Sequence, residues 1–376
     1  MELKTSTSVD IKRANRRSVL RYVLSQNATS RQEVAQALHI SMPTVLQNIN
    51  ELAERGLVRE VGQYESTGGR KASIIQANAD ARFCIGVDIT KNHIGFVLVD
   101  LAGRLRQEAR IHCPYANSPD YYRALHQQAL AFAADACPQP DHIAFAGVSI
   151  PGILSADKNR ITDSHALGLR DLDGRAFREQ LPWPCTFEND ANAAGLAELR
   201  DRPADQTMVY LSLSNSVGGA VVMDGRLYPG KNCRSGEFGH MRIVPGGEAC
   251  YCGQRGCLDA YCSAQRLSDQ AADGRLETFF ESLQQGDAAA QAVWDVYLEH
   301  LATAIISLRM AFDCDIVVGG YVGAFLEEWL PQLRRRVRAL DTFDEPCGYL
   351  SCCRYKKSAS AYGAALQPLE HYLNTI

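Results

Sequence analysis

The sequence predicts an α/β fold: an N-terminal winged helix-turn-helix domain followed by a larger α/β body of two similar lobes. Three observations support this prediction. Residues 12–52 contain three short segments whose apolar residues recur at helical spacing. From Phe83 onward, strand-like segments alternate with helical ones, which is typical of α/β domains. The pair of strands that opens this body recurs at residue 208, which indicates two lobes with a cleft between them.

Composition bounds the class of protein. The chain has 376 residues, with 39 basic and 43 acidic side chains and a net charge of −4. At roughly 100–200 residues per domain, this length predicts two or three domains, and the charge balance excludes a histone-like polycation. A mean hydropathy of −0.19 argues against an integral membrane protein. The first ten residues lack the apolar segment of a secretory signal, so we expect a cytoplasmic protein without a membrane partner.

Charge is unevenly distributed along the chain. Residues 1–80 hold 11 basic and 8 acidic side chains, a net charge of +3, whereas the remainder holds 28 and 35, a net charge of −7. A basic N-terminal part on an acidic body suggests that only the N-terminal part contacts a polyanion.

The N-terminal part has the pattern of a helix-turn-helix. Apolar residues of 12–24 fall on one helical face. Ser30 and Glu33 have the spacing of a capping box, which predicts the start of a second helix. A third helix is expected from Ser41, after a tight turn. The last helix of such a motif can enter the major groove of DNA.

The outward side chains of the third helix are expected to contact DNA, because hydroxyls and amides suit base edges. A hairpin wing over residues 62–75 would add cations for phosphate or minor-groove contact. The expected DNA contacts are Ser41, Met42, Thr44, Gln47, Asn48, Arg70 and Lys71. Glu51 lies one turn further along and is expected to face solvent. The alternative is an ordinary three-helix protein-interaction module.

The body is predicted from segment length and residue type. Its expected strands are 85–89, 94–100, 143–149, 208–213, 218–223 and 316–319, and its expected helices are 121–137 and 288–312.

Two polar motifs lie in this body. Glu188–Ala194 is a strand end that runs into a small-residue helix, where an amide and a carboxylate can bind a ligand, or where Asn or Asp simply caps the helix. Gly236–His240 suggests a tight turn that presents a Glu and a His, with an ordinary surface turn as the alternative.

A cysteine cluster predicts a metal site. The chain has 13 cysteines, which we expect to be reduced thiols rather than a disulfide framework. Cys250, Cys252 and Cys257 lie within eight residues, and with His240 they form a Cys₃His set, the composition of a structural zinc site. Cys262 is a rival ligand, and inert thiols are the alternative. A redox role is disfavoured, because the cluster contains no C-x-x-C pair.

With these motifs, the chain resembles the ROK family, and most of all its transcriptional regulators, such as repressors for xylose, glucose and N-acetylglucosamine. The resemblance rests on Glu188–Ala194, Gly236–His240 and Cys250–Asp259, together with the winged helix. It implies an actin-like ATPase (RNase H-like) body with a sugar between the lobes and Zn²⁺ as cofactor. The implied sugar contacts are Asn189, Asp190, Glu237, His240 and Asp259, and the implied zinc ligands are His240, Cys250, Cys252 and Cys257. Asp259 stands where the family usually has Glu, and Pro151-Gly152 matches the turn at the cleft rim.

The resemblance also separates regulators from kinases. The family's kinases cradle ATP phosphates with glycine-rich turns, like D-x-G-G-T and G-T-G. Here the corresponding segments are Asp88–Asn92 and Ser214–Val217, which lack those glycines. Asp190 aligns with the kinases' catalytic base, yet it would have no phosphoryl donor. We therefore expect no catalytic residues and no kinase activity.

The resulting prediction is a sugar-responsive, DNA-binding regulator, in particular a repressor. The expected domains are the winged helix-turn-helix at 1–80, a first lobe at 81–196 with helix 360–376, and a second lobe with the zinc loop at 197–359. The expected partners are double-stranded operator DNA, a monosaccharide or sugar-phosphate effector, and a second copy of the chain in a homodimer or homotetramer. The alternatives are a ROK sugar kinase that phosphorylates a hexose or N-acetylhexosamine, and a protein-interaction scaffold.

Overall fold

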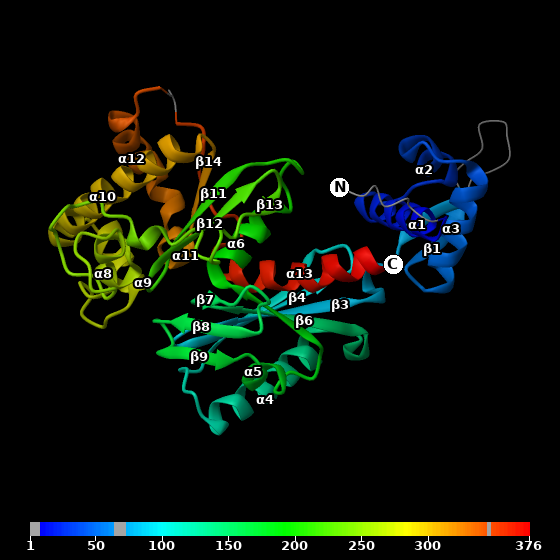
Figure 1. Ribbon diagram of the computed structural model, residues 1–376, viewed down its shortest axis with the longest axis horizontal. Helices are drawn as coiled ribbons and strands as arrows, with labels where there is room; N and C mark the ends of the chain where they lie inside the picture. The colour runs from blue at the N-terminus through cyan, green and yellow to red at the C-terminus, as the bar shows by residue number, and fades with distance from the viewer. Residues whose placement is uncertain (1–7, 64–72, 344–346) are drawn as a thin grey trace.

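The protein consists of a small N-terminal head beside a two-lobed body (Figure 1). The computed structural model describes residues 8–63, 73–343 and 347–376. In the described residues, no helix is both long and apolar enough to cross a membrane.

The head has the predicted order of three helices and a two-stranded wing. Its elements are α1 (Ser8–Ser25), α2 (Arg31–Leu38), α3 (Met42–Glu54), β1 (Val58–Gln63) and β2 (Ser73–Ala77), with β1 antiparallel to β2. The capping box is confirmed, because Ser30 accepts a hydrogen bond from the Glu33 N–H and Glu33 accepts one from the Ser30 N–H. The Ser41 hydroxyl caps α3 by accepting from the Thr44 N–H.

The first lobe contains a five-stranded sheet covered on both faces. In the order β10-β6-β3-β4-β5, its strands are Cys185–Asn189, Ile143–Ile150, Phe83–Ile89, His93–Asp100 and Leu105–His112. Helix α4 (Pro119–Ala136) packs on one face through Tyr121, Leu125 and Phe132, and α13 (Ala359–Thr375) packs on the other. A smaller antiparallel sheet of β7 (Ile153–Leu154), β8 (Arg160–Ser164) and β9 (Leu169–Asp173), followed by α5 (Arg175–Arg178), flanks this lobe.

The second lobe repeats the same opening. In the order β13-β12-β11-β14-β15, its strands are Arg226–Leu227, Val217–Met223, Met208–Leu213, Asp315–Gly319 and Leu350–Cys352. In both sheets an antiparallel pair is joined by a parallel third strand, as β3 with β4 and β6, and β11 with β12 and β14. The helices of this lobe are α7 (Asp259–Cys262), α8 (Ala264–Ser268), α9 (Leu276–Gln284), α10 (Ala288–Phe312), α11 (Gly320–Gly323) and α12 (Leu326–Leu340). The predicted two-lobed α/β body is confirmed.

Short 3₁₀ turns also occur along the described residues: η1 (Ala79–Ala81), η2 (Pro140–His142), η3 (Phe238–His240) and η4 (Lys356–Ser358).

Two helices connect the lobes at their centre. Helix α6 (Asp190–Leu199) packs against β11 and β12 of the second lobe and against α13. The crossing of α6 with α13 is close, because a Cβ on Gly363 would lie 1.6 Å from the Ala193 carbonyl oxygen. Only glycine fits at this point of α13.

The head is seated on the C-terminal end of α13. Val19, Leu20 and Val23 of α1 share a hydrophobic core with Leu373 and Ile376. Basic side chains of α1 add polar contacts: Arg16 Nε donates to the Ile376 carbonyl oxygen at 2.8 Å, Arg17 donates to the Asn374 carbonyl oxygen, and Arg21 pairs with Glu370 at 2.5 Å. Some of the basic side chains that we expect to contact a polyanion therefore bind the body of the protein instead and hold the head against it.

Candidate functional site

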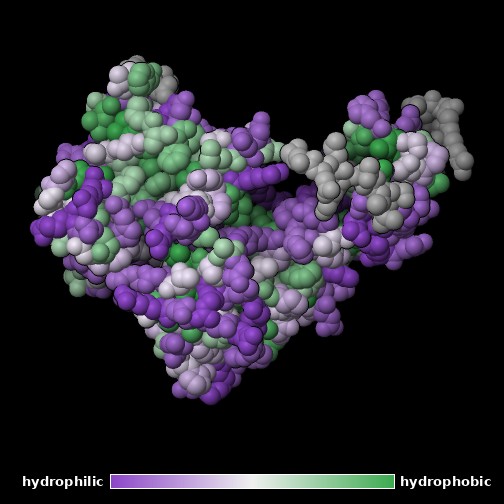
Figure 2. All heavy atoms as spheres, in the orientation of Figure 1, coloured by the Kyte–Doolittle hydropathy of each residue, from purple (hydrophilic) through white to green (hydrophobic). Residues whose placement is uncertain are grey.

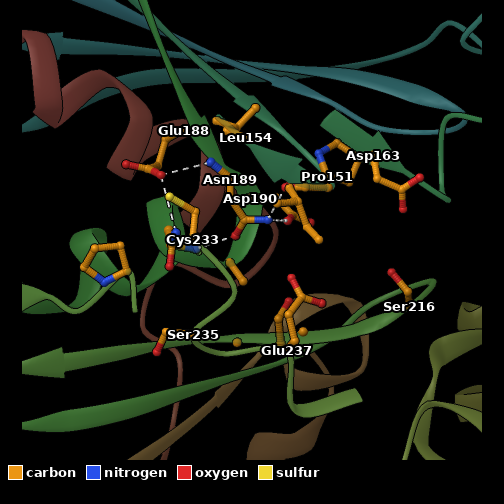
Figure 3. A pocket seen from close by; sticks show the side chains of 18 of the residues that line it. Pro151, Leu154, Asp163, Glu188, Asn189, Asp190, Ser216, Cys233, Ser235 and Glu237 are labelled. Atoms are coloured by element: carbon orange, nitrogen blue, oxygen red, sulfur yellow. Dashed lines mark hydrogen bonds between the residues drawn. The ribbon is translucent and has the colours of Figure 1, made fainter. Parts of the chain in front are cut away.

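A cavity of about 430 Å³ lies between the lobes, where β10 ends and α6 begins (Figure 3). Four of the five predicted sugar contacts line it: Asn189, Asp190, Glu237 and His240. The first two belong to the first lobe and the last two to the loop that follows β13. Residues about 50 positions apart in the sequence therefore face one space.

Asn189 caps α6 and also lines the cavity. Its Oδ1 accepts a hydrogen bond from the Asn192 N–H at 2.9 Å, which makes it the N-cap of α6. Its Nδ2 donates to the Gly152 carbonyl oxygen at 3.0 Å and to Asp190 Oδ1 at 3.1 Å. These bonds fix the rim turn and the neighbouring carboxylate while Asn189 still lines the cavity. Burial raises the pKa of Asp190, so its charge lacks full solvation.

Glu237 reaches the cavity from the opposite lobe, and its carboxylate faces toward Asp190 (Figure 3). The preceding Gly236 has a φ of +87°, and a Cβ there would lie 2.2 Å from the Gly219 carbonyl oxygen. This glycine is therefore required for the turn that presents Glu237. Burial, and then the charge of Asp190, raise the pKa of Glu237. Half-buried carboxylates of this kind are strong acceptors for ligand hydroxyl groups.

The four predicted metal ligands come together beside the cavity. One ligand atom from each of His240, Cys250, Cys252 and Cys257 lies within 4.8 Å of all the others. The Cys252 and Cys257 sulfurs are 3.8 Å apart, and His240 Nδ1 is 4.0 Å from Cys250 Sγ. Ligand sulfurs on a tetrahedral ion with bonds of about 2.3 Å lie roughly 3.8 Å apart, so the set fits a metal ion. The rival Cys262 is fully buried, and its thiol donates to the Tyr297 carbonyl oxygen.

The fifth predicted sugar contact, Asp259, lies apart from the other four. Asp259 does not line the cavity; it is 6% exposed, and its Oδ2 accepts a hydrogen bond from the Val217 N–H at 2.6 Å. The carboxylate thus fixes the first residue of β12, behind the cavity wall. Asp259 also begins the short helix α7, which carries its side chain toward the β11–β12 turn.

Sequence reasoning missed several lining residues that belong to irregular segments. From the first lobe these are Lys158, Asp163 and His165, and from the second lobe Lys231, Cys233 and Tyr251. Lys158 forms an ion pair with the buried Glu188 carboxylate, which also accepts from Gln367 of α13. In the sequence, Tyr251 is marked only by its position between two predicted metal ligands. No local pattern marks the other five residues as lining a cavity.

The cleft also contains a much smaller cavity beside the segments Asp88–Asn92 and Ser214–Val217. This second cavity of about 40 Å³ is lined by Asp88, Thr90, Asn215, Ser216 and Tyr321, among others. Burial raises the pKa of Asp88 to about 6, although the Ser149 hydroxyl donates to its Oδ1 at 2.8 Å. Arg110 of β5 lies over the Tyr321 ring, 5.0 Å from its centroid. Side chains from both lobes thus occupy this region.

In the head, the exposed residues near the start of α3 are neutral. Met42 is 48% exposed, Leu46 is 45% exposed, and Gln47 is exposed as predicted. The prediction that Asn48 faces outward is wrong: it is 1% exposed, and its amide donates to the Thr44 carbonyl oxygen. Its spacing from Val45 places it on the buried face. Leu46, which the sequence analysis omitted, takes an outward position.

The remaining predictions for the head concern Glu51, the start of α3 and the wing. Glu51 does not simply face solvent, because Lys12 and Arg16 each pair with its carboxylate at 2.6 Å. The hydrogen bond from Lys12 is the largest cause of its lowered pKa. Ser41 and Thr44 share a 2.8 Å hydrogen bond between their hydroxyls at the start of α3. Arg70 and Lys71 lie outside the described residues.

The fold and the site define a class: two-lobed proteins of the actin-like kinase type that carry a helix-turn-helix domain. The chain belongs to the ROK family, whose sequence profile matches residues 84–369, and a helix-turn-helix profile matches residues 14–61. It is 31% identical to the xylose repressor of Bacillus spizizenii over 68% of this chain and 67% of that protein. It is 23% identical to the DNA-binding transcriptional dual regulator NagC of Escherichia coli, over 83% and 81% of the two chains.

Solved structures share the fold. The crystal structure of a ROK family transcriptional regulator, a homologue of the E. coli MLC protein, superposes with a TM-score of 0.75 over 97% of both chains at 21% identity. A ROK family glucokinase from Streptomyces griseus, in complex with glucose and AMPPNP, superposes with a TM-score of 0.64 over 75% of this chain and 98% of that chain at 24% identity. The body fold is therefore common to regulators and kinases, whereas the first of these structures also spans the head.

Proposed function

We propose that this protein is a sugar-responsive transcriptional repressor, in which the cavity senses the sugar and the head binds operator DNA. The observation that carries the proposal is the cavity: Asn189 and Asp190 from one lobe and Glu237 and His240 from the other face one space. A ligand that contacts both lobes favours one relative lobe angle, and it can shift the heads by as much as its affinities for the two states differ. The two similar regulators support this function.

The effector is better explained as an uncharged monosaccharide than as a sugar phosphate. The carboxylates of Asp190 and Glu237 border the cavity, and burial raises the pKa of both. Of the two lysines that line it, Lys158 already pairs with Glu188, and Lys231 is exposed. A phosphate dianion would lie beside buried like charges, which is unfavourable in a medium of low dielectric constant. Sugar hydroxyls, in contrast, can donate to these carboxylates.

Titration calorimetry tests this assignment. D-xylose, D-glucose and N-acetyl-D-glucosamine are titrated into the protein, each beside its phosphate ester. We expect one free sugar to bind and its phosphate ester to bind at least tenfold more weakly. Tighter binding of an ester than of any free sugar would contradict the uncharged effector, and no binding by any compound would contradict the sugar sensor.

The metal is best assigned as Zn²⁺, because three thiolates and one imidazole form a closed tetrahedral set. His240 would bind it through Nδ1, which faces Cys250, and this leaves Nε2 on the cavity side, near the Tyr251 hydroxyl at 3.4 Å. Bound zinc supplies structural stability, and the chain's own residues then hold Glu237 and His240 in the cavity wall.

Metal analysis tests this assignment. The double variant Cys250→Ala/Cys252→Ala should lose stoichiometric zinc and repression, while Cys113→Ala, outside the cluster, should retain both. Elemental analysis and DNA binding are measured on the same samples. Native DNA binding by a zinc-free double variant would contradict the structural role.

The second function considered is a sugar kinase. The kinase fold and the retained Asp190 favour it. Against it, the segments at Asp88–Asn92 and Ser214–Val217 lack phosphate-binding glycines, and the cavity they border holds about 40 Å³. Phosphoryl transfer depends almost entirely on positioning the triphosphate and its metal ions, so we propose that the chain has no kinase activity. Sugar-dependent ATP hydrolysis at more than one turnover per minute would contradict this.

A short chain of contacts connects the cavity with the recognition helix. Glu188, next to Asn189, accepts from Gln367 of α13. At the C-terminal end of α13, the Ile376 carbonyl oxygen accepts from Arg16, whose guanidinium also pairs with Glu51 of α3. A shift of α13 against the first sheet would therefore move the head.

The remaining assignments are proposals of the same kind. Domains at 1–80, 81–196 with 360–376, and 197–359 agree with the packing of α13 on the first sheet.

Two copies of the chain would present two heads to a pseudo-palindromic operator, in a dimer or tetramer. In the view of Figure 2, apolar side chains gather over the second lobe. Exposed apolar residues of this lobe include Val296, Met310, Leu340 and Phe343. This surface suits contact between copies. A repressor acts where the DNA is, so a cytoplasmic location is consistent with this function.

A further inference from the structure

The two lobes also touch through a pair of aromatic rings that the sugar contacts do not include. The rings of His165 and Tyr251 are stacked, with their centroids 3.8 Å apart and their planes 5° from parallel. His165 belongs to the first lobe, in the turn between β8 and β9, and Tyr251 belongs to the metal loop of the second lobe. Both line the sugar cavity and both are exposed, so the stack lies at its mouth.

Both rings are held by rigid neighbours. His165 follows Ser164, which pairs with Leu169 across β8 and β9. The His165 carbonyl oxygen accepts a hydrogen bond from the Gly168 N–H. Tyr251 lies between Cys250 and Cys252, two members of the metal cluster. The stack therefore joins segments of the two lobes, and moving the lobes apart would separate the rings.

Tyr251 also contacts the sensing imidazole. Its hydroxyl lies 3.4 Å from His240 Nε2, and the two rings are in an edge-to-face arrangement with centroids 5.4 Å apart. This nitrogen is the one that the metal would leave for the ligand. Without a sugar, the Tyr251 hydroxyl can therefore satisfy the His240 nitrogen.

We propose that His165 and Tyr251 form an aromatic gate that holds the lobes closed over the bound effector, and that the Tyr251 hydroxyl occupies His240 Nε2 until a sugar hydroxyl replaces it. The inference rests on the proposed sugar-sensing function. Parallel aromatic contacts contribute modestly, so loss of the gate should weaken sugar binding about three- to tenfold. Loss of the hydroxyl alone should not weaken it, because the competitor for His240 is removed while the stack remains.

A double-mutant cycle tests the gate, with D-xylose, D-glucose and N-acetyl-D-glucosamine as probes and titration calorimetry as the measurement. His165→Ala and Tyr251→Ala should each raise the Kd three- to tenfold, and the double variant should bind no more weakly than either single variant. Tyr251→Phe should bind as tightly as the native chain or more tightly. Tyr228→Ala removes an exposed tyrosine outside the cavity and should change nothing. Metal content measured on every variant shows whether the loop is intact.

The outcomes separate the two proposals. If the native chain binds a sugar and the alanine variants with full metal content keep its Kd, the gate is contradicted and the sensor remains. Additive losses in the double variant would also contradict the gate, because the two rings would then act independently. If the native chain binds none of the sugars, the sensor itself fails, and the gate with it.

Discussion

The carboxylates of the cleft and the carboxylate of the recognition helix are treated in opposite ways. In the cleft, burial raises the pKa of Asp88, Asp190 and Glu237. In the head, the hydrogen bond from Lys12 is the largest cause of the lowered pKa of Glu51, and the charge of Arg16 adds to it. The cleft thus keeps acceptors available for a ligand at a cost in stability, whereas the head uses its carboxylate to hold α1 against α3.

The largest expected effect is on ligand binding. Glu237→Gln keeps the size of the side chain but replaces a charged acceptor by a neutral amide. Because hydrogen bonds to charged groups contribute about 1.5–3 kcal/mol, we expect sugar affinity to fall by about 2–3 kcal/mol. Calorimetry measures the Kd, with Glu281→Gln on the exposed face of α9 as the matched control. An unchanged Kd would show that the Glu237 carboxylate is not an effector contact.

The next effect is on stability and its pH dependence. The pKa of Asp88 is raised from 3.8 to about 6, so the folded state binds this proton more tightly than the unfolded state. Stability therefore falls as the pH rises from about 4 to 6. Asp88→Asn mimics the protonated acid, and we expect it to be more stable than the native chain by about 2 kcal/mol at pH 7.5 and equally stable near pH 4.

Urea unfolding at several pH values measures this difference. The exposed Asp141→Asn serves as the control and should follow the native chain throughout. A destabilised Asp88→Asn at pH 7.5 would mean that the cleft stabilises the charged form of Asp88, as the head stabilises that of Glu51.

A smaller effect separates two neighbouring amides of α3. Gln47 is exposed, whereas Asn48 is buried and bonded to the Thr44 carbonyl oxygen. Gln47→Ala should weaken operator binding about tenfold, since a base contact contributes about 1–3 kcal/mol. Asn48→Ala should change the operator affinity of the folded protein less than twofold. Fluorescence anisotropy with operator DNA compares them, and the reverse order would return Asn48 to the DNA-contacting face.

The smallest expected effect has the opposite sign to that of Asp88. The lowered pKa of Glu51 means that its charged form stabilises the head above the carboxyl's unfolded pKa, and that this stability is lost as the pH falls through the folded pKa. Glu51→Gln should therefore destabilise the chain by about 0.5–1 kcal/mol at pH 7 and have no effect well below pH 4. Thermal unfolding at both pH values checks this. A stabilised variant at pH 7 would contradict the pairing with Lys12 and Arg16.

The sequence predicts what depends on local spacing. The capping box at Ser30, the strand pairs that open each lobe and the Cys₃His set all follow from short-range patterns. The burial of Asn48 also follows from spacing, because its three-residue separation from Val45 places it on the inner face of α3. Its polar side chain alone indicates the opposite face.

Other features depend on contacts between distant segments. Asp259 bonds the backbone of Val217, 42 residues away, so no local pattern shows that its carboxylate is already used. The stack of His165 on Tyr251 joins two lobes, and the seat of Arg16 on Ile376 joins residues 360 positions apart. Such pairings arise from tertiary packing, which neither residue's neighbours in the sequence encode.

Capture of genomic DNA fragments tests whether this one chain couples a sugar to DNA. The purified protein is incubated with genomic fragments, with and without D-xylose, D-glucose, N-acetyl-D-glucosamine and their phosphates. We expect discrete captured fragments that one uncharged sugar releases. Absence of specific capture at low salt, or capture that no sugar changes, would contradict this coupling.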